Sequence, residues 1–130
     1  MAATEISPAN PTFQAIGSLS ISTAADGLST TVLDLNGHTL AVIEMSTGWT
    51  DASLSFLGSI DGTTTVFNIY TSTGGELTYG TSASRLLQFD PNLWAGIRCV
   101  QLRSGTAAAA VAQAAARTVR LLAAPLYRSR

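Results

Sequence analysis

The chain has 130 residues, of which 46% are hydrophobic and 12% are charged, and its formal net charge is −1 at pH 7. A chain of this length is expected to form one domain with its own core. No arginine cluster carries the interleaved aromatic residues of a nucleic-acid site. No stretch approaches the ~18 apolar residues of a membrane span, and the start, MAATEISPANP, lacks the pattern of a signal peptide. We therefore expect a soluble protein, made in a bacterial cytoplasm, that binds neither nucleic acid nor membrane.

Acids and bases are divided between two parts of the chain. Residues 1–84 contain seven acids and no base, whereas residues 85–130 contain seven arginines and one acid, Asp90. In a β-sandwich the two parts interleave in space, which brings opposite charges together. We predict that at least two of four arginines near the C-terminal strands pair with acids from the first 84 residues: Arg98, Arg103, Arg117 and Arg120.

The N-terminal part is predicted to form an extended arm followed by a strand. Residues 1–12 carry two prolines among small polar residues, which predicts an extended arm rather than a packed element. Residues 13–22 form the first expected strand. Leu19 and Ile21 share one parity and Ile16 has the other, so the pattern leaves the buried face of this strand open.

The next segment, TTVLDL-NG-HTLAVIEM, has the pattern of a β-hairpin. Asn36 and Gly37 suit the positive φ angles of a two-residue type I′ turn. This turn would place Leu33 opposite Leu40 in neighbouring strands.

A second hairpin over residues 49–70 is expected to form the centre of the fold. Apolar residues alternate with serines in DASLSFLGSI, which is the period of a strand with one buried face. With the following DG dipeptide as a type I′ turn, Phe56 lies opposite Phe67, and Leu54 opposite Ile69. We expect these four side chains to be buried together.

The remaining segments alternate between short strands and connections. Gly74-Gly75 predicts a turn before a short strand over residues 76–79. The connection over residues 80–95 carries so many large apolar groups that it must lie on the core or on another chain. A further strand is expected over residues 97–102.

The C-terminal part is less determined by its pattern. Residues 107–116 are alanine-rich, and both a short helix and an ordered loop remain open. A last strand over residues 118–124 is followed by a basic tail, residues 125–130. The expected fold is all-β, an antiparallel β-sandwich of about seven or eight strands over residues 13–124, with one short helix if the alanine-rich segment is helical.

Residues that could carry catalysis are few. His38 is the only histidine, and it flanks a turn; Cys99 is the only cysteine, which excludes an internal disulfide. Zinc or general-base chemistry needs partners that the sequence does not supply, and a lone cysteine within a strand is usually a small buried hydrophobe. We expect no catalytic residue, no metal and no cofactor.

The two tryptophans, Trp49 and Trp94, admit three interpretations. A large amphipathic ring can pack in the core, lie in a subunit interface, or stack on a sugar ring at the surface.

Two stretches carry a resemblance to a known family: LDLNGHTLAVIEMSTGWTDASLSFLGSIDG and LLQFDPNLWAGIRCVQLRSGTAAAAVAQAAARTVRLLAAP. They resemble short β-rich proteins encoded among the structural genes of tailed bacteriophages and prophage-like elements, over roughly residues 28–125. The matching positions are Gly37, Leu40, Trp49, Ala52, Leu54, Phe56, Ser59, Asp61, Gly62, Trp94, Gly96, Arg98, Arg103, Ser104, Gly105, Thr106 and Gln113. The family's proline before V-x-Q is replaced here by Ala110. The S-x-D-G turn and the later I-R-x-x-x-L-R strand are also similar to the galactose-binding-like jelly roll, which implies a jelly-roll-like sandwich.

The phage resemblance implies a non-enzymatic virion structural protein whose partners are identical subunits and other virion proteins, such as the major capsid protein. On the particle we expect a capsid decoration protein or head-spike base. A tail or head–tail connector subunit and a carbohydrate-binding module for host glycans are the alternatives. A structural subunit should expose apolar residues over a flat patch, and a glycan module should expose a tryptophan in a groove. The candidate interface residues are Ile6, Trp49, Trp94, Leu126, Tyr127, Arg128 and Arg130.

Overall fold

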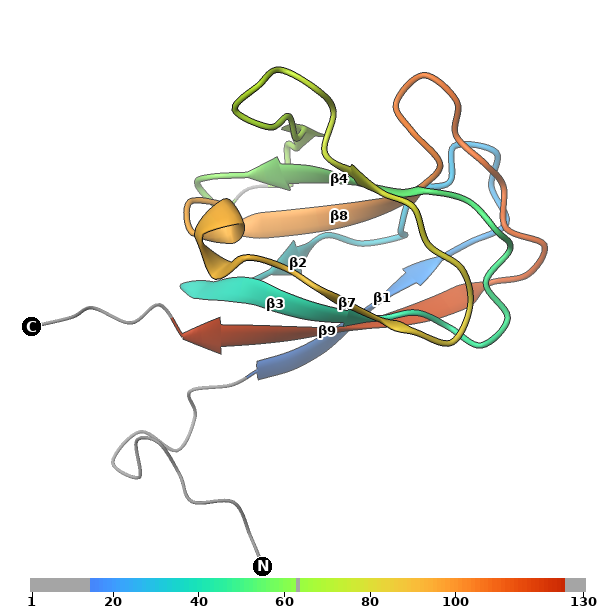
Figure 1. Cartoon of the computed structure of the whole chain (residues 1–130), viewed down its shortest axis with the longest axis horizontal. Coiled ribbons are helices and arrows are strands. Elements are labelled where there is room, and N and C mark those ends of the chain that lie inside the picture. Colours follow the sequence, from blue (N-terminus) through green and yellow to red (C-terminus); the bar gives the residue numbers. More distant parts are fainter. Residues whose placement is uncertain (1–14, 63, 126–130) are drawn as a thin grey trace, which may run out of the picture.

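A computed structural model describes residues 15–62 and 64–125; the expected arm, residues 1–12, and the tail residues 126–130 lie outside this part. The described chain forms nine strands and one 3₁₀ helix, η1 (Figure 1). The elements are β1 (Ala15–Ile21), β2 (Leu33–Asp34), β3 (His38–Glu44), β4 (Leu54–Ser59), β5 (Phe67–Asn68), β6 (Thr78–Tyr79), β7 (Leu86–Gln88), η1 (Pro91–Trp94), β8 (Cys99–Ser104) and β9 (Arg117–Pro125).

The strands form two antiparallel sheets that face each other across the core (Figure 1). Sheet A has the order β1-β9-β3-β7, and sheet B has the order β2-β8-β4-β5, with β6 also paired to β4. Strands β1 to β4 alternate between the sheets, so β1 pairs with β9, β2 with β8, and β3 with both β7 and β9. This nested pairing of early with late strands is the double-sheet arrangement of a jelly roll. The expected all-β sandwich is confirmed.

Aromatic side chains fill the centre of the core. Phe56 on β4 is fully buried, and its ring lies 5.1 Å from that of Trp94 and 5.9 Å from that of Phe89, edge to face in both cases. Edge-to-face contacts at this separation are favourable because a positive ring edge meets a negative ring face. The connection over residues 80–95 therefore supplies core residues, one of the two places that the sequence allowed.

The expected register of the central hairpin is wrong by two residues. In the structure Phe67 pairs with Gly58 rather than with Phe56, and the Ile69 amide donates to the Phe56 carbonyl at 3.0 Å. Because the shift is even, Phe67 keeps the parity of Phe56. It lies at the open end of the strand pair, however, and is 70% exposed. The expected burial of Phe67 with Phe56 and Leu54 is therefore also wrong.

The turn explains this shift. Gly62 has a positive φ of 80°, but the described non-glycine residues with a positive φ are Asn36 and Ser84, so Asp61 does not have one. A type I′ turn requires positive φ at both central residues. The connection between the end of β4 at Ser59 and the start of β5 at Phe67 is consequently longer than a two-residue turn.

The first predicted hairpin has the expected turn but not the expected strand pair. Asn36 and Gly37 have φ angles of 52° and 82°, as a type I′ turn requires. The strands on either side enter different sheets, however, and Leu33 pairs with Val100 instead of Leu40. The predicted Leu33–Leu40 pair is therefore wrong, and the turn forms a corner between the two sheets.

The alanine-rich segment, residues 107–116, is a loop without a helix. Its anchor is Gln113, whose side chain is 2% exposed. Gln113 Nε2 donates to the Thr50 carbonyl at 3.0 Å and to Ser104 Oγ at 2.8 Å, and its Oε1 accepts from the Thr50 amide at 2.7 Å. These bonds satisfy backbone groups of a distant loop and hold the segment in place without helical hydrogen bonds.

Both ends of the described chain lie at one end of sheet A. Ala15, the first residue of β1, pairs with Ala123 near the end of β9. The arrowheads of β4 and β9 lie at this same end of the molecule (Figure 1). The first and last described residues therefore lie at the end of the molecule where β4 also ends, in the opposite sheet.

Candidate interaction site

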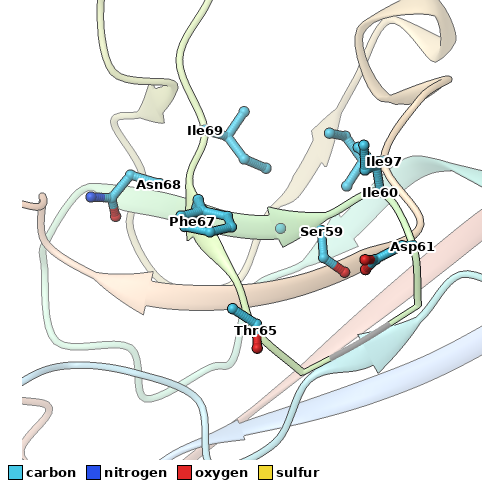
Figure 2. Close-up of a pocket in the computed structure, with 9 residues that line it drawn as sticks. Ser59, Ile60, Asp61, Thr65, Phe67, Asn68, Ile69 and Ile97 are labelled. Atoms are coloured by element: carbon cyan, nitrogen blue, oxygen red, sulfur yellow. The ribbon is translucent and has the colours of Figure 1, made fainter.

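A groove of about 380 Å³ opens where β4 passes into β5. Its apolar lining comes from four side chains, and we call it the end groove (Figure 2). These are Ile60, Phe67, Ile69 and Ile97. Ile60 is 79% exposed and Phe67 70% exposed, so two large hydrophobic groups stand at the mouth of the groove.

A glycine in β4 accounts for the shape of the end groove. Gly58 pairs with Phe67, which therefore has no side chain opposite it to pack against. A Cβ at Gly58 would lie only 2.9 Å from Ile97 Cγ2 and 3.0 Å from Ile69 Cδ1. The glycine thus allows these two isoleucines to close over the strand, as glycines within strands often do at close approaches.

Charged side chains border the end groove. Arg98 donates from Nε and from its terminal nitrogen to the two carboxylate oxygens of Asp34, each at 3.3 Å. These bonds, with the amide of Asn36, hold the pKa of Asp34 below its ordinary value. Asp34 is the main group that raises the pKa of Arg98, and Asp61 adds a smaller effect. Asp61 lines the groove, and the Asp34–Arg98 pair lies beside the turn that follows it, so these three groups give the rim a formal net charge of −1.

A second apolar surface covers the outer side of sheet A, and we call it the sheet A face. Its solvent-facing apolar side chains are Ile16, Val42, Leu86 and Leu122, and the buried Leu121 lies beneath them. Cross-strand pairing aligns Ile16, Leu122 and Val42 in one row over three strands. Ile16 is 66% and Leu86 64% exposed, so this sheet surface is apolar where it meets solvent.

An exposed ion pair lies within the sheet A face. Arg120 Nε is 3.2 Å from Glu44 Oε1, and the two residues are direct cross-strand partners on β9 and β3. The face therefore carries one charge of each sign beside its apolar row.

The predicted charge pairing is confirmed for three of the four arginines. Besides Arg98 and Arg120, Arg103 is 2.7 Å from Glu76, and this pair is largely buried. Arg103 also donates to Ser55 Oγ at 3.0 Å and to Asn68 Oδ1 at 2.9 Å. It thus ties β8 to β4, β5 and the segment before β6, which is a structural role.

The two tryptophans are core residues. Trp49 is 4% exposed and Trp94 is fully buried. Neither indole presents a face to a sugar ring or to a second chain. The other five candidate interface residues, Ile6, Leu126, Tyr127, Arg128 and Arg130, lie outside the described residues.

Groups suited to catalysis or metal binding remain separate in the described part of the chain. His38 Nδ1 lies 3.1 Å from the Leu35 carbonyl beside the turn, and Cys99 is buried. Within residues 15–62 and 64–125, no three His, Cys, Asp or Glu side chains gather as a metal ion would need. A search of the same ranges finds no helix with the length and hydrophobicity to cross a membrane.

The exposed hydrophobic residues are the part of the site that sequence reasoning misses. The sequence pattern places Phe67 in the core, and it places Ile60 in a strand and Leu86 in a connection. Gly58 is the available signal, because a glycine inside a strand marks an irregularity in packing.

No known protein-family profile matches the chain, and no curated protein matches it in sequence. Among solved structures, it is similar to the SPBc2 prophage-derived protein YomS, with a TM-score of 0.49 and 15% sequence identity. This alignment covers 86% of this chain and 95% of that chain. The functional assignment therefore depends on the chain's own residues and surfaces.

Proposed function

We propose that the protein is a non-enzymatic structural component of a tailed-phage virion, a capsid decoration protein or head-spike base that binds the shell and neighbouring copies. The sequence resemblance to phage structural proteins supports this role, and the jelly roll is a recurrent fold of viral capsid domains. Fold alone does not specify function, so the surface of the sandwich must supply the argument.

The sheet A face is the observation that carries the proposal. A sheet in solution normally presents polar side chains outward, whereas here Ile16 and Leu86 are 66% and 64% exposed beside Val42 and Leu122. Contiguous exposed apolar surface marks an interaction site. On a symmetric shell each copy repeats the same contact, so even a modest patch gives firm attachment through multivalency.

The alternatives differ in what they need from the surface. A glycan module that stacks sugars on tryptophan is disfavoured because Trp49 and Trp94 are 4% and 0% exposed. A tail or head–tail connector subunit would use the same apolar face, and its position on the particle distinguishes it. In either virion role, we propose that the two ends, residues 1–12 and 125–130, reach neighbouring chains.

Reconstitution of particles tests the role of the sheet A face. Purified virions that lack the protein would be incubated with the wild-type chain or with Ile16→Ser/Leu86→Ser, and occupancy measured by quantitative mass spectrometry and cryo-electron microscopy. We expect the double variant to lose most of its occupancy because its apolar contact is removed. Tyr70→Ser is the matched control, since Tyr70 is 56% exposed outside both apolar surfaces.

Two results would contradict the proposal. One is a wild-type protein that does not bind particles at defined positions, and the other is a double variant that binds with wild-type occupancy. Density on the neck or tail instead of the head would replace the decoration role with the connector alternative.

A further inference from the structure

We propose that the end groove binds the C-terminal tail of a second copy of this chain, with Leu126 and Tyr127 in the apolar lining and the following arginines at the acidic rim. This inference rests on the proposed function, because it assigns the contact between copies that adjoin on a particle. It differs from the sheet A face, which meets the shell.

The groove has the chemistry of a receptor for a short apolar anchor. Its volume of about 380 Å³ lies in the range of sites that enclose small ligands. Ile60 and Phe67 are 79% and 70% exposed at its mouth, while Ile69 and Ile97 form its deeper wall. In Figure 2 the Phe67 ring lies over β4, and Ile60 and Ile97 lie together on the other side of the groove. An aromatic ring in the groove would contact Phe67 edge to face.

The tail has the complementary sequence. Pro125 ends β9 at the end of the molecule where β4 also ends (Figure 1), and the groove opens where β4 passes into β5. The residues that follow are LYRSR, two large apolar side chains and then two arginines. Their two positive charges would meet the Asp61 carboxylate of the lining and the Asp34–Arg98 pair beside it, which together carry a net charge of −1. Exposed ion pairs add little affinity, so the arginines set the direction of the tail and the apolar residues hold it.

Chain geometry favours the groove of a second copy over the chain's own. Leu126 and Tyr127 follow Pro125 directly, so the backbone of two residues can reach at most about 7 Å beyond it. The groove belongs to the opposite sheet, about 10 Å away across the core. It also lies on the β5 side of β4, whereas β1, the neighbour of β9, contacts β2 and β8. The chain's own groove is therefore beyond the reach of the anchor backbone.

Peptide binding to the purified full-length chain tests this assignment without any particle. The receptor would be Leu126→Ser/Tyr127→Ser, whose own tail lacks the anchors, and the probe a fluorescein-labelled peptide PLYRSR followed by anisotropy. We expect saturable binding that Phe67→Ser in the receptor weakens about tenfold or more, as for loss of an aromatic anchor. Leu86→Ser is the matched control because Leu86 is 64% exposed on the sheet A face; it should change affinity less than about twofold.

The same variants test the link between copies. In sedimentation, the wild-type chain should gain mass with concentration, and both Phe67→Ser and the tail variant should remain monomeric. No binding of the peptide up to about 1 mM, the effective concentration that neighbours on a particle provide, would overturn the inference. So would unchanged affinity of the Phe67→Ser receptor, or an equal loss with Leu86→Ser.

Two further results separate the ways in which these assays can fail. A wild-type chain that stays monomeric while the peptide binds only the tail variant would mean that the chain's own tail fills the groove, which overturns the second-copy assignment. A protein that fails these assays but occupies virions keeps its proposed function, and one that passes them but never joins particles loses it.

Discussion

Phe56 and Phe67 show how strongly one residue type can differ in role within one strand pair. Both have the same parity and belong to antiparallel neighbours, yet Phe56 is fully buried and Phe67 is 70% exposed. Phe56 contacts the rings of Tyr79, Phe89 and Trp94, whereas Phe67 faces Gly58 at the edge of the sandwich. The difference arises from the register of β4 and β5. It places Phe67 opposite Gly58 at the open end of the strand pair, two residues from the position opposite Phe56 that the sequence predicted.

Truncation of each phenylalanine should give very different losses of stability. Phe56→Ala removes a fully buried ring and leaves a cavity, so we expect the free energy of unfolding to fall by about 3–5 kcal/mol. Phe67→Ala removes an exposed ring and should cost less than about 1 kcal/mol. Urea denaturation of both variants measures this, and losses of equal size would mean that Phe67 belongs to the core after all.

Gln113 and Arg103 are the polar residues on which the packing depends most. Each is nearly inaccessible to solvent and bonded to partners far away in sequence: Gln113 to Thr50 and Ser104, and Arg103 to Ser55, Asn68 and Glu76. A buried polar group without such bonds would destabilise the fold. Their neighbours in the chain give no sign of these partners.

At the scale of elements, two glycines show that turns of similar backbone conformation are constrained in different ways. Gly37, in the corner between the sheets, has a φ of 82°, and a Cβ added there would meet nothing within 4 Å. Gly105, after β8, has a φ of 95°, and a Cβ there would lie 2.5 Å from the Ala109 carbonyl oxygen and 2.6 Å from the Val111 nitrogen.

Alanine at these two positions should therefore separate backbone strain from steric overlap. Gly37→Ala is expected to cost about 1–2 kcal/mol, because only the positive φ is unfavourable to an L-residue. Gly105→Ala adds a clash with backbone atoms and should cost more than about 3 kcal/mol. Thermal and urea unfolding of both variants would show the order, and equal costs would mean that the loop after β8 yields to the added methyl group.

The alanine-rich loop illustrates how tertiary contacts override local preference. Alanine favours helix, yet residues 107–116 form none, and Gly105 and Ala110 instead make an isolated β-bridge. A short isolated helix of small side chains gains little from burial. The side-chain amide of Gln113 gains several buried hydrogen bonds in the loop, which favours the observed conformation.

For the molecule as a whole, the jelly roll explains the division of charge along the sequence. Nested pairing puts early strands, which carry the acids, beside late strands, which carry the arginines. Glu44 on β3 is the direct partner of Arg120 on β9, and Asp34 on β2 lies beside Arg98, just before β8. The acids and arginines, which lie in separate parts of the sequence, therefore form ion pairs with each other in the folded protein.

This arrangement predicts a loss of stability in acid. Hydrogen bonds from Arg98 lower the pKa of Asp34 in the folded state, so the unfolded state binds the proton more readily. The stabilisation is present above the unfolded value of about 3.9 and is lost as the pH falls through the lower folded value. In urea denaturation between about pH 6 and pH 2, Asp34→Asn should lose less stability than wild type below about pH 4.

Asp51→Asn provides the control for this comparison, since Asp51 is exposed in a loop. Its pH profile is the baseline for the loss of one exposed carboxylate. If Asp34→Asn follows that profile, the Asp34–Arg98 pair makes no contribution to acid stability.

The sequence by itself determined the properties that depend on a few neighbouring residues. Alternating apolar residues indicated β4, the NG dipeptide indicated the turn at Asn36 and Gly37, and the large apolar groups of residues 80–95 indicated burial. Parity and turn geometry act over short distances, so these features are visible locally. The separated acids and arginines also indicated interleaving, because opposite charges meet where strands from both halves alternate.

Only the tertiary structure decided which strands pair, in what register, and which hydrophobic side chains remain exposed. Arg98 and Asp34 are 64 positions apart in sequence, and nothing beside either residue identifies the other. The sheet to which a strand belongs depends on the packing of the entire core. Two strands joined by a tight turn can either pair with each other or, as at Asn36 and Gly37, enter different sheets, and the sequence pattern is the same in both cases. The end groove and the sheet A face follow from those pairings, because the free energy that fixes them comes from contacts between distant segments.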